Sequence, residues 1–192
     1  MEIVAFPHPA LRHESKPVKR VDASLRQIVR TMFDLMYEHR GVGLAANQVA
    51  LPLRLFVMNL AADPNDGEEH VLINPVLSRP KGSAEQEEGC LSFPELYAPV
   101  RRPEAISVQA YSLDGEAFEG DLDGLVSRVV QHETDHLDGV VFTDRLSESH
   151  QLAVRPTLDE FELTFQSRRQ VGEIPDDVEI ADRLTQWERE YC

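Results

Sequence analysis

The sequence predicts an α+β fold in which antiparallel strands and hairpins pack around a central helix, with a further helix near the C-terminus. Residues 22–39 and 124–138 carry apolar side chains at helical spacing, whereas residues 53–60 and 105–113 are rich in strand-forming side chains. Strands and helices do not alternate regularly along the chain, so a parallel sheet with helices on both faces is not expected.

The first helix is predicted over residues 22–39. Asp22 is suited to cap its start, and Gly41 follows its end. The apolar residues recur at the spacing of one buried helix face, and they are Leu25, Ile28, Val29, Met32, Phe33 and Met36. The next residues, 41–48, have the pattern of neither a helix nor a regular strand.

Two strands are predicted next, over residues 53–60 and 71–77, with a polar turn at residues 63–67 between them. Asn74-Pro75 interrupts the second strand. Because proline cannot donate a hydrogen bond to a strand ladder, an edge position or a bulge is predicted there. Residues 79–87 are expected to form a polar loop.

A hairpin and the central helix follow. Residues 105–113 are predicted as a strand that turns at Asp114-Gly115, a hairpin signal, into a strand over residues 116–122. Asp123 is a suitable cap for the helix over residues 124–138. These elements, together with residues 1–104, are expected to belong to one domain.

The C-terminal part is expected to be helical and acidic. A helix is predicted between Ser149 and Phe165, interrupted early by Pro156. We therefore expect one domain over residues 1–165, followed by an acidic C-terminal extension over residues 166–192. Trp187 in this extension is expected to dock on the core.

Composition limits the classes of protein to which the chain can belong. Its 192 residues, 42% hydrophobic and 28% charged, suit a single globular domain. The formal charge of −15 disfavours direct DNA binding and attraction to anionic lipid. No run of 18 apolar residues and no secretion signal are visible, so no membrane association is expected. Two cysteines exclude a disulfide scaffold, and a reducing, cytoplasmic location is expected.

The central helix carries the strongest chemical signal, the string His132-Glu133-Thr134-Asp135-His136. Two histidines four residues apart differ by about 40° around a helix, so both imidazoles project from one face. Such a pair can bind one metal ion, and Glu133, next to His132 in the sequence, is placed to take a proton from a metal-bound water. The pattern therefore indicates a hydrolytic metal site.

Two histidines do not complete such a site, because catalytic metals usually have three protein ligands and one open position. One candidate is Cys90, since a thiolate binds first-row metals strongly. The alternative is an acidic or histidine side chain that follows on the chain, and the candidates are Asp138, Asp144, Glu148, His150, Asp159, Glu160 and Glu162.

Three separated strings together resemble the signature motifs of the peptide deformylases. They are Gly41-Val42-Gly43-Leu44-Ala45-Ala46-Asn47-Gln48, Glu88-Gly89-Cys90-Leu91-Ser92 and Gln131-His132-Glu133-Thr134-Asp135-His136. They match the family patterns GxGLAAxQ, EGCLS and QHExDH in order and spacing, and the resemblance covers about residues 1–165. Members of this family remove the formyl group from the N-terminal methionine of newly synthesised polypeptides and release formate.

The resemblance implies a role for each motif residue. Glu133 would be the general acid and base, while Gln48 and the backbone N–H of Leu91 would stabilise the oxyanion. One Fe(II) per chain would be the metal, with zinc, nickel or cobalt as substitutes. Its ligands would be Cys90, His132 and His136. The substrates would be nascent N-formyl-Met peptides, and the ribosome is a candidate partner.

Residues in and near these strings are expected to bind the substrate. Leu125 and Val129 precede His132 by seven and three positions, so they share its helix face and could line a pocket for the methionine side chain. A plain core role for Leu125 fits equally well. Val42 could line the same pocket from the glycine loop. Gly41 and Gly43 suit a backbone that lies alongside an extended peptide, and Gly89, which allows close backbone approach, completes the set. Glu88 and Arg102 could pair close to the ligands, and a solvated surface role for Arg102 fits equally well.

Two rival functions also fit parts of this sequence. A metallopeptidase of another HExxH type would cleave internal peptide bonds and would need neither Cys90 nor Gln48. A metal-free or metal-storing binding protein that attends ribosomes or nascent chains would keep the motifs and show no turnover. Formate release from a formylated peptide separates these functions.

Overall fold

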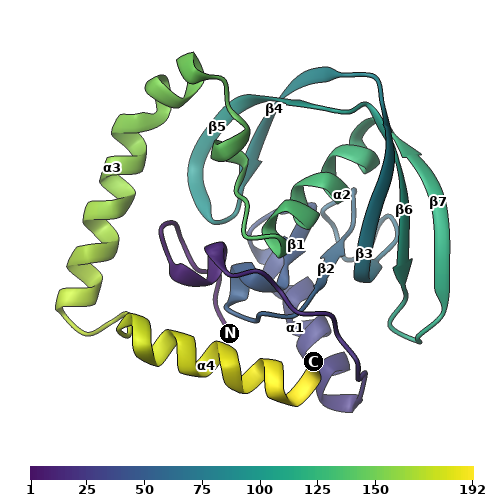
Figure 1. Ribbon diagram of the computed structural model, residues 1–192, viewed down its shortest axis with the longest axis horizontal. Helices are drawn as coiled ribbons and strands as arrows, with labels where there is room; N and C mark the ends of the chain where they lie inside the picture. The colour runs from purple at the N-terminus through teal and green to yellow at the C-terminus, as the bar shows by residue number, and fades with distance from the viewer.

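The fold, a computed structural model that describes residues 1–192, is a twisted antiparallel sheet with helices on both faces and a separate hairpin (Figure 1). The sheet has five strands in the order β1-β2-β3-β6-β7, and β4 and β5 form a second, two-stranded sheet. The strand bounds are Gly43–Ala45 (β1), Leu55–Met58 (β2), His70–Lys81 (β3), Ala84–Cys90 (β4), Phe93–Arg102 (β5), Ala105–Tyr111 (β6) and Ala117–Asp123 (β7). The α+β class predicted from the sequence is confirmed.

Four α-helices and three short 3₁₀ turns complete the chain. Helix α2 lies between the five-stranded sheet and the β4–β5 hairpin, whereas α3 and α4 run along the outside (Figure 1). The helices are α1 (Ala23–Glu38), α2 (Gly124–Leu137), α3 (Glu148–Gln170) and α4 (Asp177–Tyr191), and the 3₁₀ turns are η1 (Pro9–Arg12), η2 (Ala46–Val49) and η3 (Phe142–Arg145). No helix combines the length and the apolar character that a membrane span requires.

The two faces of strand β2 explain how the sheet is covered. Successive side chains of a strand point to opposite faces, and all of β2 is buried. Leu55 and Val57 belong to the apolar cluster that includes α1, whereas Phe56 and Met58 belong to the cluster that includes Val129 of α2. The sheet is therefore packed between α1 and α2, which places α2 in the interior.

Helix α1 forms as the sequence predicts. The Asp22 carboxylate accepts a hydrogen bond from the Leu25 amide at 2.9 Å, which caps the first turn. Leu25, Met32 and Met36 are fully buried against the sheet. Burial of such side chains is worth about 2 kcal/mol each, so the apolar face rather than helix propensity holds α1 in place.

The predicted irregularity at Asn74-Pro75 is a bulge. The register between β3 and β6 shifts between Ile73 and Val76, and Asn74 has a left-handed backbone with φ of 53°. The Asn74 side chain accepts from the Val18 amide at 2.8 Å and donates to the Val18 carbonyl at 2.9 Å. Because β3 lies between β2 and β6, the alternative of an edge strand was wrong.

The expected polar loop over residues 79–87 was wrong. These residues complete β3, which reaches Lys81, and begin β4 at Ala84. Strand β5, for which no element was predicted, pairs with β4 along its whole length. Glu85, Gln86 and Glu87 are exposed, so β4 lacks the apolar alternation that identifies a half-buried strand.

Further differences concern element boundaries. Residues 41–48, which matched neither pattern, contain β1 and most of η2, both too short to show a period. The strand predicted over residues 53–60 is confined to Leu55–Met58. The expected break at Pro156 is absent, because α3 continues through this exposed proline to Gln170. The expected domain boundary at residue 165 therefore lies inside α3.

The C-terminal extension folds back onto the body. The Asp176 carboxylate caps α4 by accepting from the Glu179 amide at 2.9 Å. Ile180 and Leu184 pack with Ala10 of η1, and the Tyr191 carbonyl accepts from the Lys19 amide at 2.8 Å. Trp187 packs against the α1 cluster, as its expected docking requires.

The docking of α4 can be tested at Leu184, which is only 4% exposed. Replacing this side chain by Ala should lower the free energy of unfolding by about 2–3 kcal/mol, because it leaves a cavity beneath the helix. Urea denaturation measures the change, with the exposed neighbour Asp182→Ala as the control. An equal, small effect of both substitutions would show that α4 contributes no packing energy.

Candidate metal centre

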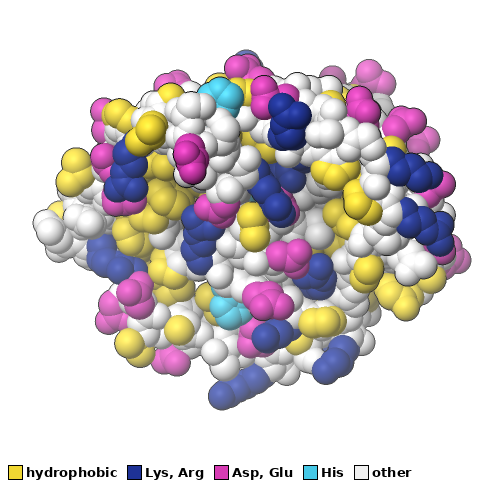
Figure 2. Space-filling view, turned by 45° about the horizontal axis from the view of Figure 1, so that its top comes forward, with side chains coloured by type: hydrophobic (Ala, Val, Ile, Leu, Met, Phe, Trp, Pro, Cys, Tyr) yellow, Lys and Arg dark blue, Asp and Glu magenta, His cyan; other side chains and the backbone are white.

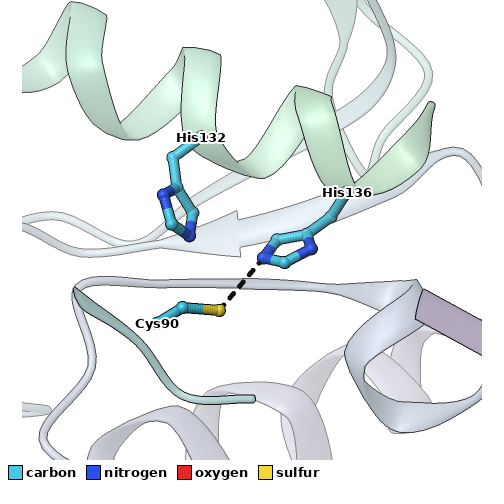
Figure 3. Close-up of side chains that lie close together, drawn as sticks. All are labelled: Cys90, His132 and His136. Atoms are coloured by element: carbon cyan, nitrogen blue, oxygen red, sulfur yellow. Dashed lines mark hydrogen bonds between the residues drawn. The ribbon is translucent and has the colours of Figure 1, made fainter. Parts of the chain in front are cut away.

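Three side chains from two elements converge on one point. One ligand atom each from Cys90, His132 and His136 lies within 4.8 Å of the others (Figure 3). The Cys90 Sγ and His136 Nε2 are 3.3 Å apart. Cys90 ends β4, whereas both histidines stand on one face of α2, as their four-residue spacing predicts. A soft thiolate with two imidazoles is a donor set that suits first-row divalent metals.

The alternative ligands that follow α2 do not join this group. Asp138 pairs with Arg54 at 2.6 Å, and Asp144 pairs with Arg12. Neither belongs to the set of mutually close donor atoms, which consists of Cys90 and the two histidines. Of the candidate donors, Cys90 is therefore the one that lies close to both histidines.

Glu88 sets the orientation of His132. Its Oε2 lies 2.9 Å from His132 Nδ1. Burial alone would raise the pKa of Glu88, but hydrogen bonds from His132 and Arg102 outweigh it and lower the pKa to about 2. The carboxylate is therefore ionised, so Nδ1 must donate the hydrogen bond. This contact leaves Nε2 facing the centre, where it can bind a metal in exchange for its own proton.

The pKa values of the two histidines are shifted in opposite directions. Burial lowers the pKa of His132, but its hydrogen bonds with Cys90 and Glu88 outweigh burial and raise the pKa to about 10. For His136, burial, followed by the charge of His132, lowers the pKa well below its ordinary value. The neutral His136 ring is a ready ligand, and its buried Nδ1 has no protein partner. These residues fit a bound cation.

Behind the ligands lies a buried ion network. Arg102 Nε and Nη2 donate to Glu88 at 2.6 and 3.0 Å, and Arg102 Nη1 donates to Asp135 at 2.7 Å. The expected Glu88–Arg102 pair is thus present, with both side chains at most 5% exposed. Arg145 completes the network from η3 by donating to Asp135 at 2.6 Å. Buried charges require partners of this kind.

Sequence reasoning missed three members of this network. Asp135 lies inside the HExxH string, whose pattern assigns no role to this position. Arg128, whose Nη1 lies 2.5 Å from Glu88 Oε1, precedes His132 by one helical turn. It is the one Lys or Arg within α2, a signal that could have identified it. Arg145 lies in a short 3₁₀ turn, and no pattern in the sequence points to its contact with Asp135.

Gln48 and Glu133 are two further polar side chains beside the centre. Gln48 is buried in η2, where its Oε1 accepts from the Ala45 amide at 2.8 Å. This bond orients the amide so that Nε2 lies 3.4 Å from Cys90 Sγ and 3.3 Å from Ser92 Oγ. Glu133 is 4% exposed, and its buried Oε2 has no protein partner. Glu133 therefore offers an unused polar atom to a ligand, whereas the Gln48 Nε2 is directed at the Cys90 sulfur.

A cavity of about 470 Å³ opens onto the centre. Gly43 leaves room for Glu133 there, because a Cβ on this glycine would lie 2.5 Å from Glu133 Oε1. Val129 is buried in its wall and Leu125 is 54% exposed at its rim. His136 is buried and does not line the cavity. The other residues singled out from the sequence that line the cavity are Val42, Gln48, Gly89, Cys90, Leu91 and His132.

Comparison with known proteins identifies the family. The sequence model of the polypeptide deformylases matches residues 1–152. A peptide deformylase of Rhodopirellula baltica is 46% identical over 191 residues, which are 100% of this chain and 95% of that protein. A peptide deformylase of Neisseria gonorrhoeae is 44% identical over 158 residues, 82% of this chain and 93% of that protein.

A solved structure agrees with this assignment. Peptide deformylase 1B of Arabidopsis thaliana, bound to an inhibitor, superposes with a TM-score of 0.85 at 39% identity. The match covers 92% of this chain and 97% of that chain. The fold, the donor set and the sequence relatives agree, and the chain therefore belongs to the polypeptide deformylase family, hydrolases that remove the N-formyl group from the N-terminal methionine of new polypeptides.

Proposed function

We propose that Cys90, His132 and His136 hold one divalent metal ion and that the formyl group is hydrolysed beside it. The observation that carries this proposal is the convergence of one sulfur and two ring nitrogens at the end of the 470 Å³ cavity. When bound, such an ion supplies Lewis acidity, which polarises the formyl carbonyl and lowers the pKa of the attacking water.

We infer that the resident ion is Fe(II), one per chain, with zinc, nickel or cobalt as substitutes. A thiolate with two imidazoles accepts several first-row ions, so the choice of iron follows the family resemblance rather than the donor set. The Cys90 ligand separates this site from other HExxH hydrolases, in which a cysteine ligand is not needed. This favours deformylation over cleavage of internal peptide bonds.

Glu133 is assigned the proton transfers. Burial raises the pKa of this carboxyl to about 7. A group that titrates near neutral pH can both take the proton from the attacking water and return it to the departing amine. Its unpartnered Oε2 is the atom proposed to carry that proton. The products are formate and a free N-terminus.

Gln48 and Leu91 are assigned to the charge that develops on the formyl oxygen. The orientation of Gln48 by the Ala45 amide supports the role of Nε2 as a fixed donor. The Leu91 N–H follows Cys90 directly and is proposed as the second donor. Loss of one such donor typically costs about 3 kcal/mol of transition-state stabilisation.

The cavity walls suit a formyl-methionyl peptide. Val129 offers a buried apolar wall for the methionine side chain, with Val42 and Leu125 nearer the rim. Gly43 and Gly89 allow a peptide backbone to approach closely, which would bind many sequences by main-chain hydrogen bonds.

Nascent formylated chains are the proposed partners, and we propose a cytoplasmic site of action with the ribosome as a further candidate partner. On the face shown in Figure 2, acidic and basic side chains are interspersed. This surface supports no preference for DNA or for anionic membranes.

Glu133→Gln tests the proton-transfer role. The variant should still bind one metal ion per chain, because Glu133 is not a proposed ligand. It should release formate from formyl-Met-Ala-Ser at least about 100-fold more slowly, because the amide cannot take a proton. Metal analysis and the formate assay measure the two properties. A variant with wild-type turnover would rule out the role of Glu133.

Glu133→Gln should also change the free energy of unfolding of the chain when a chelator keeps it free of metal. The folded-state pKa of Glu133 is raised from 4.5 to about 7, so its stabilising contribution is present below about pH 4.5 and is lost as pH rises through 7. Glu133→Gln should therefore exceed wild type in free energy of unfolding by up to about 3 kcal/mol at pH 8, and by little at pH 4.5. The exposed Glu87→Gln is the control. A pH-independent difference would contradict the effect of burial.

Cys90→Ser tests the ligand set, with Cys192→Ser as the matched control because the chain has no other cysteine. Wild type loaded with Co(II) should show a sulfur-to-cobalt charge-transfer band, and Cys192→Ser should retain it. Cys90→Ser should lose the band and bind the metal far more weakly, because a hydroxyl is a poorer ligand than a thiolate. Retention of the band and of activity in Cys90→Ser would favour the rival metallopeptidase.

A further inference from the structure

The donor set of the metal centre is divided between two parts of the fold. The histidines stand on α2, whereas Cys90 ends β4 of the hairpin. The hairpin is not hydrogen-bonded to the five-stranded sheet. The buried apolar side chains of β5 belong to a cluster that contains no α2 residue. Polar contacts must therefore set the distance between the hairpin and the helix.

Arg128 makes such contacts with both strands at once. Its Nη2 donates to the Ala84 carbonyl of β4 at 3.0 Å, and its Nη1 donates to the Val100 carbonyl of β5 at 3.1 Å. Nη1 also lies 2.5 Å from Glu88 Oε1. The side chain is 8% exposed, and its Cα is one helical turn before His132. One guanidinium thus ties the backbone of the whole hairpin to the helix that carries the histidines.

The role of Arg128 differs from that of Arg102. Arg102 belongs to the hairpin and holds Glu88 through two nitrogens, so His132 would keep its carboxylate partner without Arg128. The backbone attachment of α2 to β4 and β5 is what Arg128 adds. It requires a planar fork of donors, which lysine, a single point charge, does not provide.

We propose that Arg128 is a positioning residue that holds the hairpin bearing Cys90 at ligand distance from His132 and His136. This inference rests on the proposed metal site. Without the attachment, the sulfur and the two ring nitrogens would no longer be held in one arrangement before a metal binds. Loss of such preorganisation weakens metal binding and disturbs the metal–sulfur bond.

The experiment compares Arg128→Met and Arg128→Lys in the full-length chain loaded with Co(II). The control is Arg101→Met on strand β5 of the hairpin, where the Arg101 side chain is 67% exposed and pairs with Glu85 at 3.5 Å. The affinity for Co(II) is measured by competition with a chelator, and the sulfur-to-cobalt band is recorded. Both Arg128 variants should bind Co(II) about tenfold or more weakly, with a weaker or shifted band, and kcat should fall more than KM rises. Arg101→Met should match wild type.

Several outcomes overturn the proposal. Wild-type affinity in Arg128→Lys would show that Arg128 only neutralises Glu88. Unchanged affinity and band in both variants, with a raised KM, would limit Arg128 to a wall of the peptide cavity. If Arg128→Met does not fold, Arg128→Lys decides, since it keeps the charge beside Glu88. A wild-type chain without the sulfur band would contradict the proposed metal site itself, and the positioning role with it.

Discussion

The buried carboxylate of Glu88 is the interaction on which the rest of the site depends. It accepts hydrogen bonds from Arg102, Arg128 and His132, so one ionised group joins β4, β5 and α2. An unpaired charge in this position would be strongly unfavourable, and three donors offset its loss of hydration. The same contacts fix the tautomer of His132, which directs Nε2 towards Cys90. Folding of the network and assembly of the donor set are therefore one event.

Around this carboxylate, different side chains hold the fold together and line the cavity. Helix α2 buries Val130 and Leu137 against the five-stranded sheet, which fixes its axis. The two histidines project from a different face of the helix, and His132 and Glu133 line the cavity. The hairpin brings Cys90 from the opposite side, and η2 brings Gln48. The site is therefore supported by a helix packed on the sheet, and its side chains come from three elements that are distant in the chain, namely α2, the hairpin and η2.

Periodic elements and local motifs could be predicted from the sequence, whereas contacts between distant elements could not. The apolar face of α1, the bulge at Asn74-Pro75 and the hairpin at Asp114-Gly115 have local signatures, and the structure contains each of them. Strand β4 lacked a signature because its exposed side chains are polar, and its partner β5 supplies the burial. The three motifs indicated Cys90 and the histidines. The contact of Arg145 with Asp135 depends on how η3 packs, which no local pattern records.

X-ray absorption spectroscopy of the chain loaded with one zinc ion tests the central claim most directly. Convergence of Cys90, His132 and His136 predicts that zinc has one sulfur ligand at about 2.3 Å and two imidazole nitrogens at about 2.0 Å. The fourth coordination position would hold an oxygen or nitrogen donor such as water. A shell of nitrogen and oxygen alone, or a shell with two sulfurs, would contradict it.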